Sequence, residues 1–419
     1  MPAAGQAAPE FTMDPRVPEP SCNGHSAEHP AGSGEVETLL QHLGEEEHPL
    51  GALVPPLFQS AIYTYRDLDL FEAANEAPYR EDPVYSPWGN PTVSLVERKM
   101  AALDGTEAAK LTGDGMAAIG TALLASLERG SHVVTVDSTY STTLRLLRET
   151  LERYGVRFTC VDGRDPETIF DAVTADTSVI YLESPSSLLF RLQDLRAIAA
   201  FAKQRGITTM IDNTYSTPLF QRPAELGVDI VLQSTSKYLG GHSDLNGGAI
   251  CTTKERIERM AHGEVKLFGT IMAPFVAWLL LRGLRTLPLR LRHVQESANL
   301  VASWLEQRPE VEVVHHVGLA SYPQRELFLS QMRGSTGLFT FVPKNQDREW
   351  TKAFLEALRV FRIGVSWGGP FSLAIPVTDP TSPAESPVRM IRLYCGLEHP
   401  KDLVADLDQA LEAAHRKCP

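Results

Sequence analysis

The sequence is short of positive charge and of long apolar runs. Its 39 lysines and arginines are outnumbered by 52 aspartates and glutamates, which gives a formal net charge of −13. Nucleic acid and anionic membranes are therefore not expected as main partners. The longest apolar stretch, residues 273–281, is broken by Pro274 and followed by Arg282, so it is too short to cross a membrane. No basic segment followed by an apolar run opens the chain, and we expect no secretion signal.

Cysteine pairs are also lacking. The five cysteines are scattered, odd in number and never arranged as C-x-x-C. This pattern argues against a disulfide framework and against a cysteine metal site. We therefore expect no metal, and a reducing compartment such as the cytoplasm.

The length and composition predict more than one folded unit. A chain of 419 residues exceeds what one hydrophobic core usually supports, and 43% hydrophobic with 22% charged residues is typical of a globular protein. Residues 1–34 are rich in Ala, Pro, Gly and Glu without apolar periodicity, which predicts a disordered tail. A short helix at residues 36–44 is expected to open the folded part.

Residues 230–250, IVLQSTSKYLGGHSDLNGGAI, carry the most informative local pattern. An apolar strand ends in Ser234, Ser236 and Lys237, and glycine pairs follow. One interpretation is a solvated lysine in a glycine-rich turn. The other is a desolvated, nucleophilic Lys237 that forms a Schiff base, with the hydroxyls of Ser234 and Ser236 bound to a phosphate.

The second interpretation gains support from Asp212, which ends a β-branched run at residues 208–212. Residues at the carboxyl ends of neighbouring parallel strands face one crevice, so Asp212 and Lys237 are expected to meet. A carboxylate at this place would keep the pyridine nitrogen of pyridoxal phosphate protonated.

The strings DNTYSTP (212–218) and STSKYLGGHSD (234–244) resemble patterns of the Cys/Met-metabolism, or trans-sulfuration, family of fold-type I pyridoxal-phosphate enzymes. Its members include cystathionine γ-synthase, the cystathionine lyases and methionine γ-lyase, and the resemblance extends from about residue 36 to residue 414. It implies an α/β fold with a mostly parallel central sheet, a smaller C-terminal α+β domain and an N-terminal arm. The implied limits are 35–91 for an inter-subunit arm, 92–284 for the cofactor domain and 285–419 for the small domain.

The alternation of strands and helices from about residue 107 to 252 independently predicts a mostly parallel sheet. A helix is expected at residues 113–130, after a short link at 110–113, and a linker between domains at 268–291. Further strands are expected at 131–136, 178–182, 311–314, 337–342 and 390–394, and further helices at 95–102, 192–205, 350–358 and 401–414.

A glycine-rich helix start in DGMAA (114–118) predicts a phosphate site, because free backbone N–H groups and the helix dipole attract an anion. Gly115 and Met116 would offer their N–H groups. The family has Ser at the position of Asp114, whose carboxylate should repel phosphate, so we expect Asp114 to cap the helix instead.

The string YSPWGNPT (85–92) resembles the arm that family members lend to the neighbouring subunit. Tyr85 would bind there to the partner's cofactor and substrate. The arginine usual in this arm is replaced by Pro87, which has neither charge nor donor. Either another cation substitutes, or backbone and hydroxyl groups hold the phosphate.

Two further cofactor contacts follow from the resemblance. Tyr140, after a strand, matches the tyrosine that stacks on the pyridine ring and handles protons. Ser187 stands where relatives have the Asn that bonds the phenolic oxygen, so a weaker bond or altered electronics is expected.

The C-terminal region supplies the expected substrate contacts. In MIRLYCGLE (390–398), Arg392 would bind the α-carboxylate through its two-pronged guanidinium. In GVSWGGPFSL (364–373), Ser366 would help to hold that carboxylate, and Trp367 is typical of the lyase branch. Phe371 replaces the usual Glu, which predicts a substrate side chain without a second ammonium group.

The resemblance implies γ-replacement or γ-elimination on a homoserine-derived or sulfur-containing amino acid through a vinylglycine-type intermediate, as in cystathionine γ-synthase. Alternatives are a β- or γ-lyase, or a specialised enzyme of secondary metabolism acting on an unusual amino acid. A degenerate cofactor-binding protein and an aminotransferase are weaker alternatives, since Lys237, Asp212 and the full 234–244 string are present. A homotetramer of two catalytic dimers is expected.

Overall fold

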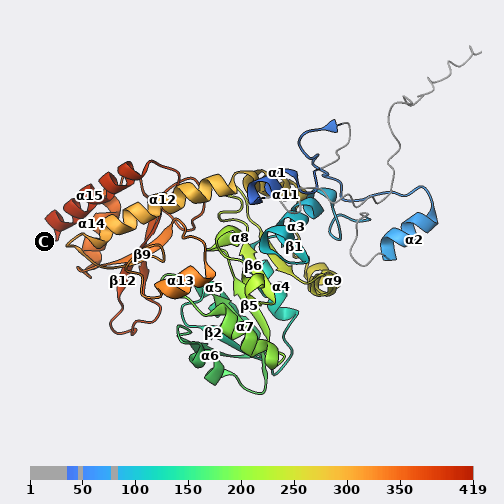
Figure 1. The fold of residues 1–419 in the computed structure, drawn as a ribbon, viewed down its shortest axis with the longest axis horizontal. Helices are drawn as coiled ribbons and strands as arrows, with labels where there is room; N and C mark the ends of the chain where they lie inside the picture. Colours follow the sequence, from blue (N-terminus) through green and yellow to red (C-terminus); the bar gives the residue numbers. More distant parts are fainter. Residues whose placement is uncertain (1–34, 46–50, 77–83, 419) are drawn as a thin grey trace, which may run out of the picture.

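The computed structural model describes residues 35–45, 51–76 and 84–418. The tail predicted for residues 1–34 lies outside them. Figure 1 shows a large sheet at the centre, a second sheet at the C-terminal end and the segment that carries α2 (Leu68–Glu76) at the opposite end.

The central sheet has seven strands in the order β1-β7-β6-β5-β4-β2-β3. Strands β2 to β6 run parallel, and β7 pairs antiparallel with both β1 and β6. The strands are β1 (Ala108–Thr112), β2 (His132–Val136), β3 (Arg157–Val161), β4 (Thr177–Glu183), β5 (Thr208–Asp212), β6 (Ile230–Ser234) and β7 (Gly248–Thr252).

Both faces of this sheet are covered by helices, because alternate strand residues point to opposite sides. Ile180, Ile211 and Val231 belong to one buried cluster, together with apolar residues of α3, α7 and α11. Met210 and Leu232 belong to the other, with residues of α4 and α9. The helices here are α3 (Pro91–Asp104), α4 (Gly115–Leu124), α5 (Ser141–Arg145), α6 (Pro166–Ala172), α7 (Leu195–Gln204), α8 (Thr217–Phe220), α9 (Lys254–His262), α10 (Glu264–Phe268) and α11 (Pro274–Arg285).

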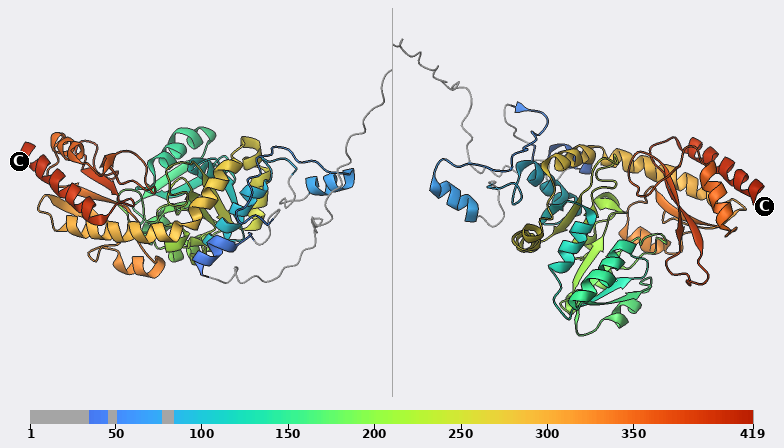
Figure 2. Two further views of the ribbon diagram at one scale, coloured as in Figure 1. Left: turned by 90° about the horizontal axis from the view of Figure 1, so that it is seen from above. Right: turned by 180° about the vertical axis from the view of Figure 1, so that it is seen from behind.

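The smaller sheet has five strands in the order β10-β11-β12-β9-β8, and only the β10–β11 pair is parallel. The long helix α12 (Leu287–Glu306) leads from the large sheet to it, which both views in Figure 2 show. The remaining elements are β8 (Val311–His315), α13 (Arg325–Gln331), β9 (Leu338–Pro343), α14 (Arg348–Ala357), β10 (Arg362–Ile363), β11 (Leu373–Thr378), β12 (Arg389–Tyr394) and α15 (Pro400–Lys417).

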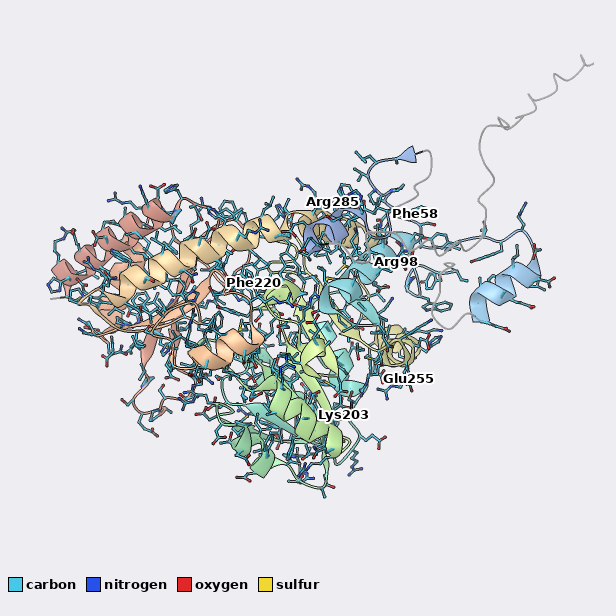
Figure 3. The ribbon with its side chains drawn as sticks, viewed as in Figure 1. Phe58, Arg98, Lys203, Phe220, Glu255 and Arg285 are labelled. Carbon is cyan, nitrogen blue, oxygen red and sulfur yellow. The ribbon has the colours of Figure 1, made fainter. Side chains whose placement is uncertain are left out.

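Residues 51–76, which come after α1 (Val36–His42) in the sequence, form an arm that projects from the body. Figure 3 labels three residues near its attachment, Phe58, Arg98 and Arg285. The Phe58 carbonyl accepts a hydrogen bond from the side chain of Asn90, and Arg285 forms an ion pair with Glu45 at 2.6 Å. Large apolar side chains on the arm remain exposed in the single chain, among them Leu53, Ile62 and Leu68.

The fold class predicted from the sequence is confirmed: a mixed α/β chain with a mostly parallel central sheet and a smaller second sheet. Two local predictions were wrong. Residues 110–113 are not a link, since most of them belong to β1, where Lys110 is buried against Glu97 at 2.9 Å. The helix expected to reach residue 130 ends at Leu124. No helix among the described residues is both long and apolar enough to span a membrane, and these residues hold no metal-binding cluster of histidine, cysteine and acidic side chains.

Candidate active site

Lys237 lies in a tight turn directly after β6. Its N–H donates to the carbonyl of Ser234 at 3.2 Å, and its own carbonyl accepts from Gly241 at 2.8 Å. Strand β5, which ends at Asp212, runs beside β6 with Asp212 in register with Leu232. Asp212 and Lys237, the two residues selected from the sequence, therefore lie at the same edge of the sheet, where two neighbouring strands end.

The environment of Lys237 favours the neutral amine. Burial lowers the pKa of Lys237, the negative charge of Asp212 opposes this effect, and the positive charge of Arg392 lowers the pKa further. The amine lies 5.7 Å from the centre of the Trp367 ring. A lysine held this way is a better nucleophile and base near neutral pH than a solvated one.

Asp212 and Glu183 form a pair of acids at the ends of neighbouring strands. Burial raises the pKa of Asp212, while hydrogen bonds from Thr214 and the charge of Lys237 lower it. Glu183 is in register with Asp212 on the neighbouring strand β4. Burial and the charge of Asp212 raise the pKa of Glu183 to about 8.

Glu183 also connects two residues predicted to touch the cofactor. One carboxyl oxygen accepts the N–H of Tyr140 at 2.6 Å, and the other accepts the hydroxyl of Ser187. Sequence reasoning did not select Glu183, although its position at the end of an apolar strand was visible. Ser187 is thus bonded to Glu183, and Tyr140 is 44% exposed.

The start of α4 lies against the end of β6. The carboxylate of Asp114 accepts the N–H of Ala117 at 2.6 Å, which confirms that Asp114 caps the helix. A Cβ on Gly115 would come within 2.9 Å of Ser234 Cβ, so only glycine fits there without displacing Ser234. Gly115 therefore lies beside Ser234, whose carbonyl accepts the N–H of Lys237. The phosphate contacts of Gly115 and Met116 stay a prediction.

The hydroxyl of Ser236 is occupied within the loop. It donates to the carbonyl of Gly247 at 3.2 Å and lies 3.0 Å from the Gly247 N–H, which donates to it. Contact with a phosphate would require one of these bonds to be exchanged. The role predicted for Ser236 stays a prediction.

The small domain brings its substrate-anchoring candidates to the same place. The guanidinium of Arg392 donates to the carbonyl of Ser366 at 3.1 Å, and Ser366 adopts a left-handed conformation with φ 75°. A Cβ on Gly368 would lie 2.6 Å from the backbone nitrogen of Tyr238, so the loop packs directly on the backbone that follows Lys237. Trp367 packs on the Tyr238 ring, with centroids 5.3 Å apart.

Tyr85 is not part of this assembly within one chain. It is 42% exposed on the arm, and its ring packs edge-on against Trp88 at 5.3 Å. Lys266 of α10 lies 3.9 Å from the centre of the Trp88 ring, next to Pro87. Tyr85 is therefore exposed on the arm, and Lys266 packs on its neighbour Trp88.

A cavity of about 550 Å³ opens beside the turn, but Lys237 itself does not line it. The cavity lies between the loop that follows the Lys237 turn and the segment that leads into α11. Its lining consists of Gly113, Ser243, Asp244, Leu245, Asn246, Ile271, Met272, Ala273 and Val276.

The residues of this edge fit pyridoxal phosphate. The chemistry requires an amine for the aldehyde, a carboxylate for the ring nitrogen and backbone N–H groups for the phosphate. These groups are present at one edge of the sheet: Lys237 supplies the amine, Asp212 the carboxylate and the glycine start of α4 the N–H groups.

Comparison with known proteins also indicates a pyridoxal-phosphate enzyme. The profile of the family described as "Cys/Met metabolism PLP-dependent enzyme" matches residues 37–412. L-methionine gamma-lyase of Pseudomonas putida is 36% identical over 91% of this chain and 98% of its own length. Cystathionine gamma-lyase of Bacillus subtilis is 35% identical over 90% and 99%. The crystal structure of cystathionine gamma synthase from Xanthomonas oryzae in complex with cystathionine superposes with a TM-score of 0.84, at 31% identity over 91% of this chain and 99% of that one.

Proposed function

Because this chain belongs to the Cys/Met metabolism PLP-dependent enzyme family, we propose that it catalyses γ-replacement or γ-elimination on a homoserine-derived or sulfur-containing amino acid. The observation that carries this proposal is the convergence of Lys237, Asp212 and Arg392. Asp212 and Lys237 follow neighbouring strands of the large sheet. The Arg392 guanidinium, from the smaller sheet, lies near enough to lower the pKa of the Lys237 amine.

Bound pyridoxal phosphate would stabilise negative charge at the substrate Cα by drawing electrons into its protonated ring. Asp212 would hold the proton on the ring nitrogen, since an anion in a poorly solvated site favours the charged form. Lys237, with its lowered pKa, would take the α-proton and later deliver protons along the side chain.

Arg392 would bind the α-carboxylate of the substrate in two-pronged geometry, and its bond to the Ser366 carbonyl would fix the direction of the guanidinium. Tyr140, exposed beside Glu183, would cover one face of the ring. Trp367, against Tyr238 and near the Lys237 amine, would exclude water from the reacting end.

The side-chain pocket favours a substrate without a distal ammonium group. Phe371 is half exposed, and the Arg362 guanidinium lies 5.2 Å from the centre of its ring. A second ammonium at this wall would meet the like charge of Arg362, which opposes binding, and no carboxylate, because Phe371 stands where a glutamate is usual. An acyl group, a methyl thioether or an anionic group meets no such penalty.

We further propose that Tyr85 works in the neighbouring subunit of a homo-oligomer. The arm projects from the body, and its residues Leu53, Ile62, Leu68 and Tyr85 are exposed in the single chain. A tetramer and a cytoplasmic location are the expectations from the sequence. A fully active monomer on sizing would refute the role of Tyr85.

The experiment is a substrate panel. Purified protein with added pyridoxal phosphate is mixed with O-acyl homoserines (with and without a thiol), methionine, cystathionine and cysteine. Mass spectrometry then measures α-keto acid against thioether product. We expect turnover of the acyl homoserines or methionine, and thioether product identifies replacement whereas α-keto acid identifies elimination. Turnover of cystathionine alone would contradict the proposed pocket, and no turnover of any substrate would contradict the function.

A further inference from the structure

Arg290, near the start of α12, is a buried cation that binds the backbone next to the catalytic lysine. Only 8% of the residue is exposed. Its Nη1 donates to the carbonyl of Tyr238 at 2.7 Å, its Nη2 to the carbonyl of Gly283 at 2.7 Å, and its Nε to the hydroxyl of Thr286 at 3.0 Å. No carboxylate in the described part of the chain forms an ion pair with it. Burial lowers the pKa of Arg290 to about 10, so it remains charged at neutral pH.

A glycine of the Lys237 turn leaves room for the Arg290 guanidinium. A Cβ on Gly241 would lie 1.9 Å from Arg290 Nη1, and Gly241 also has φ +73°, which favours glycine. A Cβ on Gly283 would lie 2.3 Å from the carbonyl oxygen of Gly240. Two glycines, one on each side, therefore allow α11 and α12 to approach the turn that holds Lys237.

The carbonyl of Tyr238 depends on Arg290 for its hydrogen bond. Within the turn, the carbonyl of Thr235 accepts from Gly240, and that of Lys237 accepts from Gly241. The Tyr238 carbonyl, one residue beyond Lys237, accepts from Arg290 instead. Gly368 packs against the backbone nitrogen of the same residue, so the peptide after Lys237 is held between α12 and the loop that carries Ser366.

We propose that Arg290 is a positioning residue that fixes the Lys237 turn against α12 and so sets the direction of the lysine amine toward the cofactor. This inference rests on the proposed function. A lysine could not replace Arg290 fully, because the planar guanidinium makes three directed bonds at once and an ammonium offers a single point of charge. A carbonyl left unbonded in a buried turn would favour a rearranged backbone.

The test compares Arg290→Lys with Arg292→Lys, a matched control on the same helix. Arg292 is 63% exposed and pairs with Glu37. Three quantities are measured on each variant: the Kd of pyridoxal phosphate, the visible circular dichroism of the lysine-bound cofactor, and kcat and KM for the best substrate of the panel. We expect Arg290→Lys to raise the cofactor Kd about tenfold, the effect of losing one directed hydrogen bond to a buried group. We also expect it to change the dichroism and to lower kcat while KM changes by less than about twofold.

If Arg290→Lys does not fold, Thr286→Val decides the question. It removes the Nε acceptor, together with the weak bond from the Thr286 hydroxyl to the Gly283 carbonyl at 3.3 Å, and conserves the side-chain volume. A smaller change of dichroism in the same direction is therefore expected. The proposal is overturned if Arg290→Lys, or Thr286→Val in its place, has the same cofactor Kd and the same dichroism as Arg292→Lys. A wild-type protein that binds no pyridoxal phosphate would instead contradict the proposed function.

Discussion

Glu183 and Asp212 are register partners on the neighbouring parallel strands β4 and β5. Asp212 is the acid expected to face the ring nitrogen, and Glu183 bonds the backbone of Tyr140 and the hydroxyl of Ser187. Because two carboxylates this close repel each other, the pKa of Glu183 rises with burial and with the charge of Asp212 to about 8. Burial raises the pKa of both acids, and Glu183 is the one whose pKa rises far enough to favour the protonated form at neutral pH.

This pairing predicts the pH dependence of stability in the cofactor-free protein. A carboxyl whose folded pKa is raised from 4.5 to about 8 binds its proton more tightly in the folded state. Its stabilising contribution is full below the unfolded pKa and is lost as the pH rises toward about 8. In thermal unfolding, the stability of the wild type relative to Glu183→Gln should therefore fall across this interval. Parallel pH profiles of the two proteins would contradict the raised pKa.

Replacing Asp212 tests the role of the acid at the ring nitrogen. Asp212→Asn should lower kcat by roughly 10- to 100-fold, since a charge-assisted hydrogen bond contributes about 1.5–3 kcal/mol. The cofactor should still be attached to Lys237, which visible absorbance would show. Asp171→Asn, an exposed acid on α6, serves as control. Unchanged kcat in Asp212→Asn would exclude the proposed role.

Arg392 should control substrate affinity rather than cofactor binding. Arg392→Gln should raise KM by about 10- to 100-fold, because it removes a two-pronged bond to the α-carboxylate. The pKa of Lys237 should also rise, since the charge of Arg392 is one of the causes that lower it. Arg389→Gln is the matched control, because Arg389 lies on the same strand and donates to the carbonyl of Gln346 instead. Equal KM values in the two variants would refute the anchor.

The main parts of the fold and site could be predicted from the sequence where a local pattern determines the structure. The apolar runs before Asp212 and Lys237 predicted strands, and both residues lie at the strand ends expected of them. The helix cap at Asp114 followed from the electrostatics of a helix start. These features depend on residues that are neighbours in sequence.

Other features depend on distant partners, which one sequence does not reveal. Residues 110–113 were interpreted as a short link, but Lys110 lies inside β1, where it forms an ion pair with Glu97 of α3. The short strand β7, which follows a glycine-rich loop, was not predicted because its identity comes from pairing with β1 and β6. Glu183 and Arg290 were missed for the same reason. Each looks like an ordinary polar residue until Asp212 or the Tyr238 carbonyl is seen beside it.

The most direct test of the account locates the cofactor on the chain. Pyridoxal phosphate is added to the purified protein, the Schiff base is reduced with borohydride, and the peptides are sequenced by mass spectrometry. We expect a single phosphopyridoxyl group on Lys237. It should be lost in Lys237→Ala and retained when the exposed Lys254 is replaced by alanine. A modification on another lysine, or none at all, would contradict this expectation.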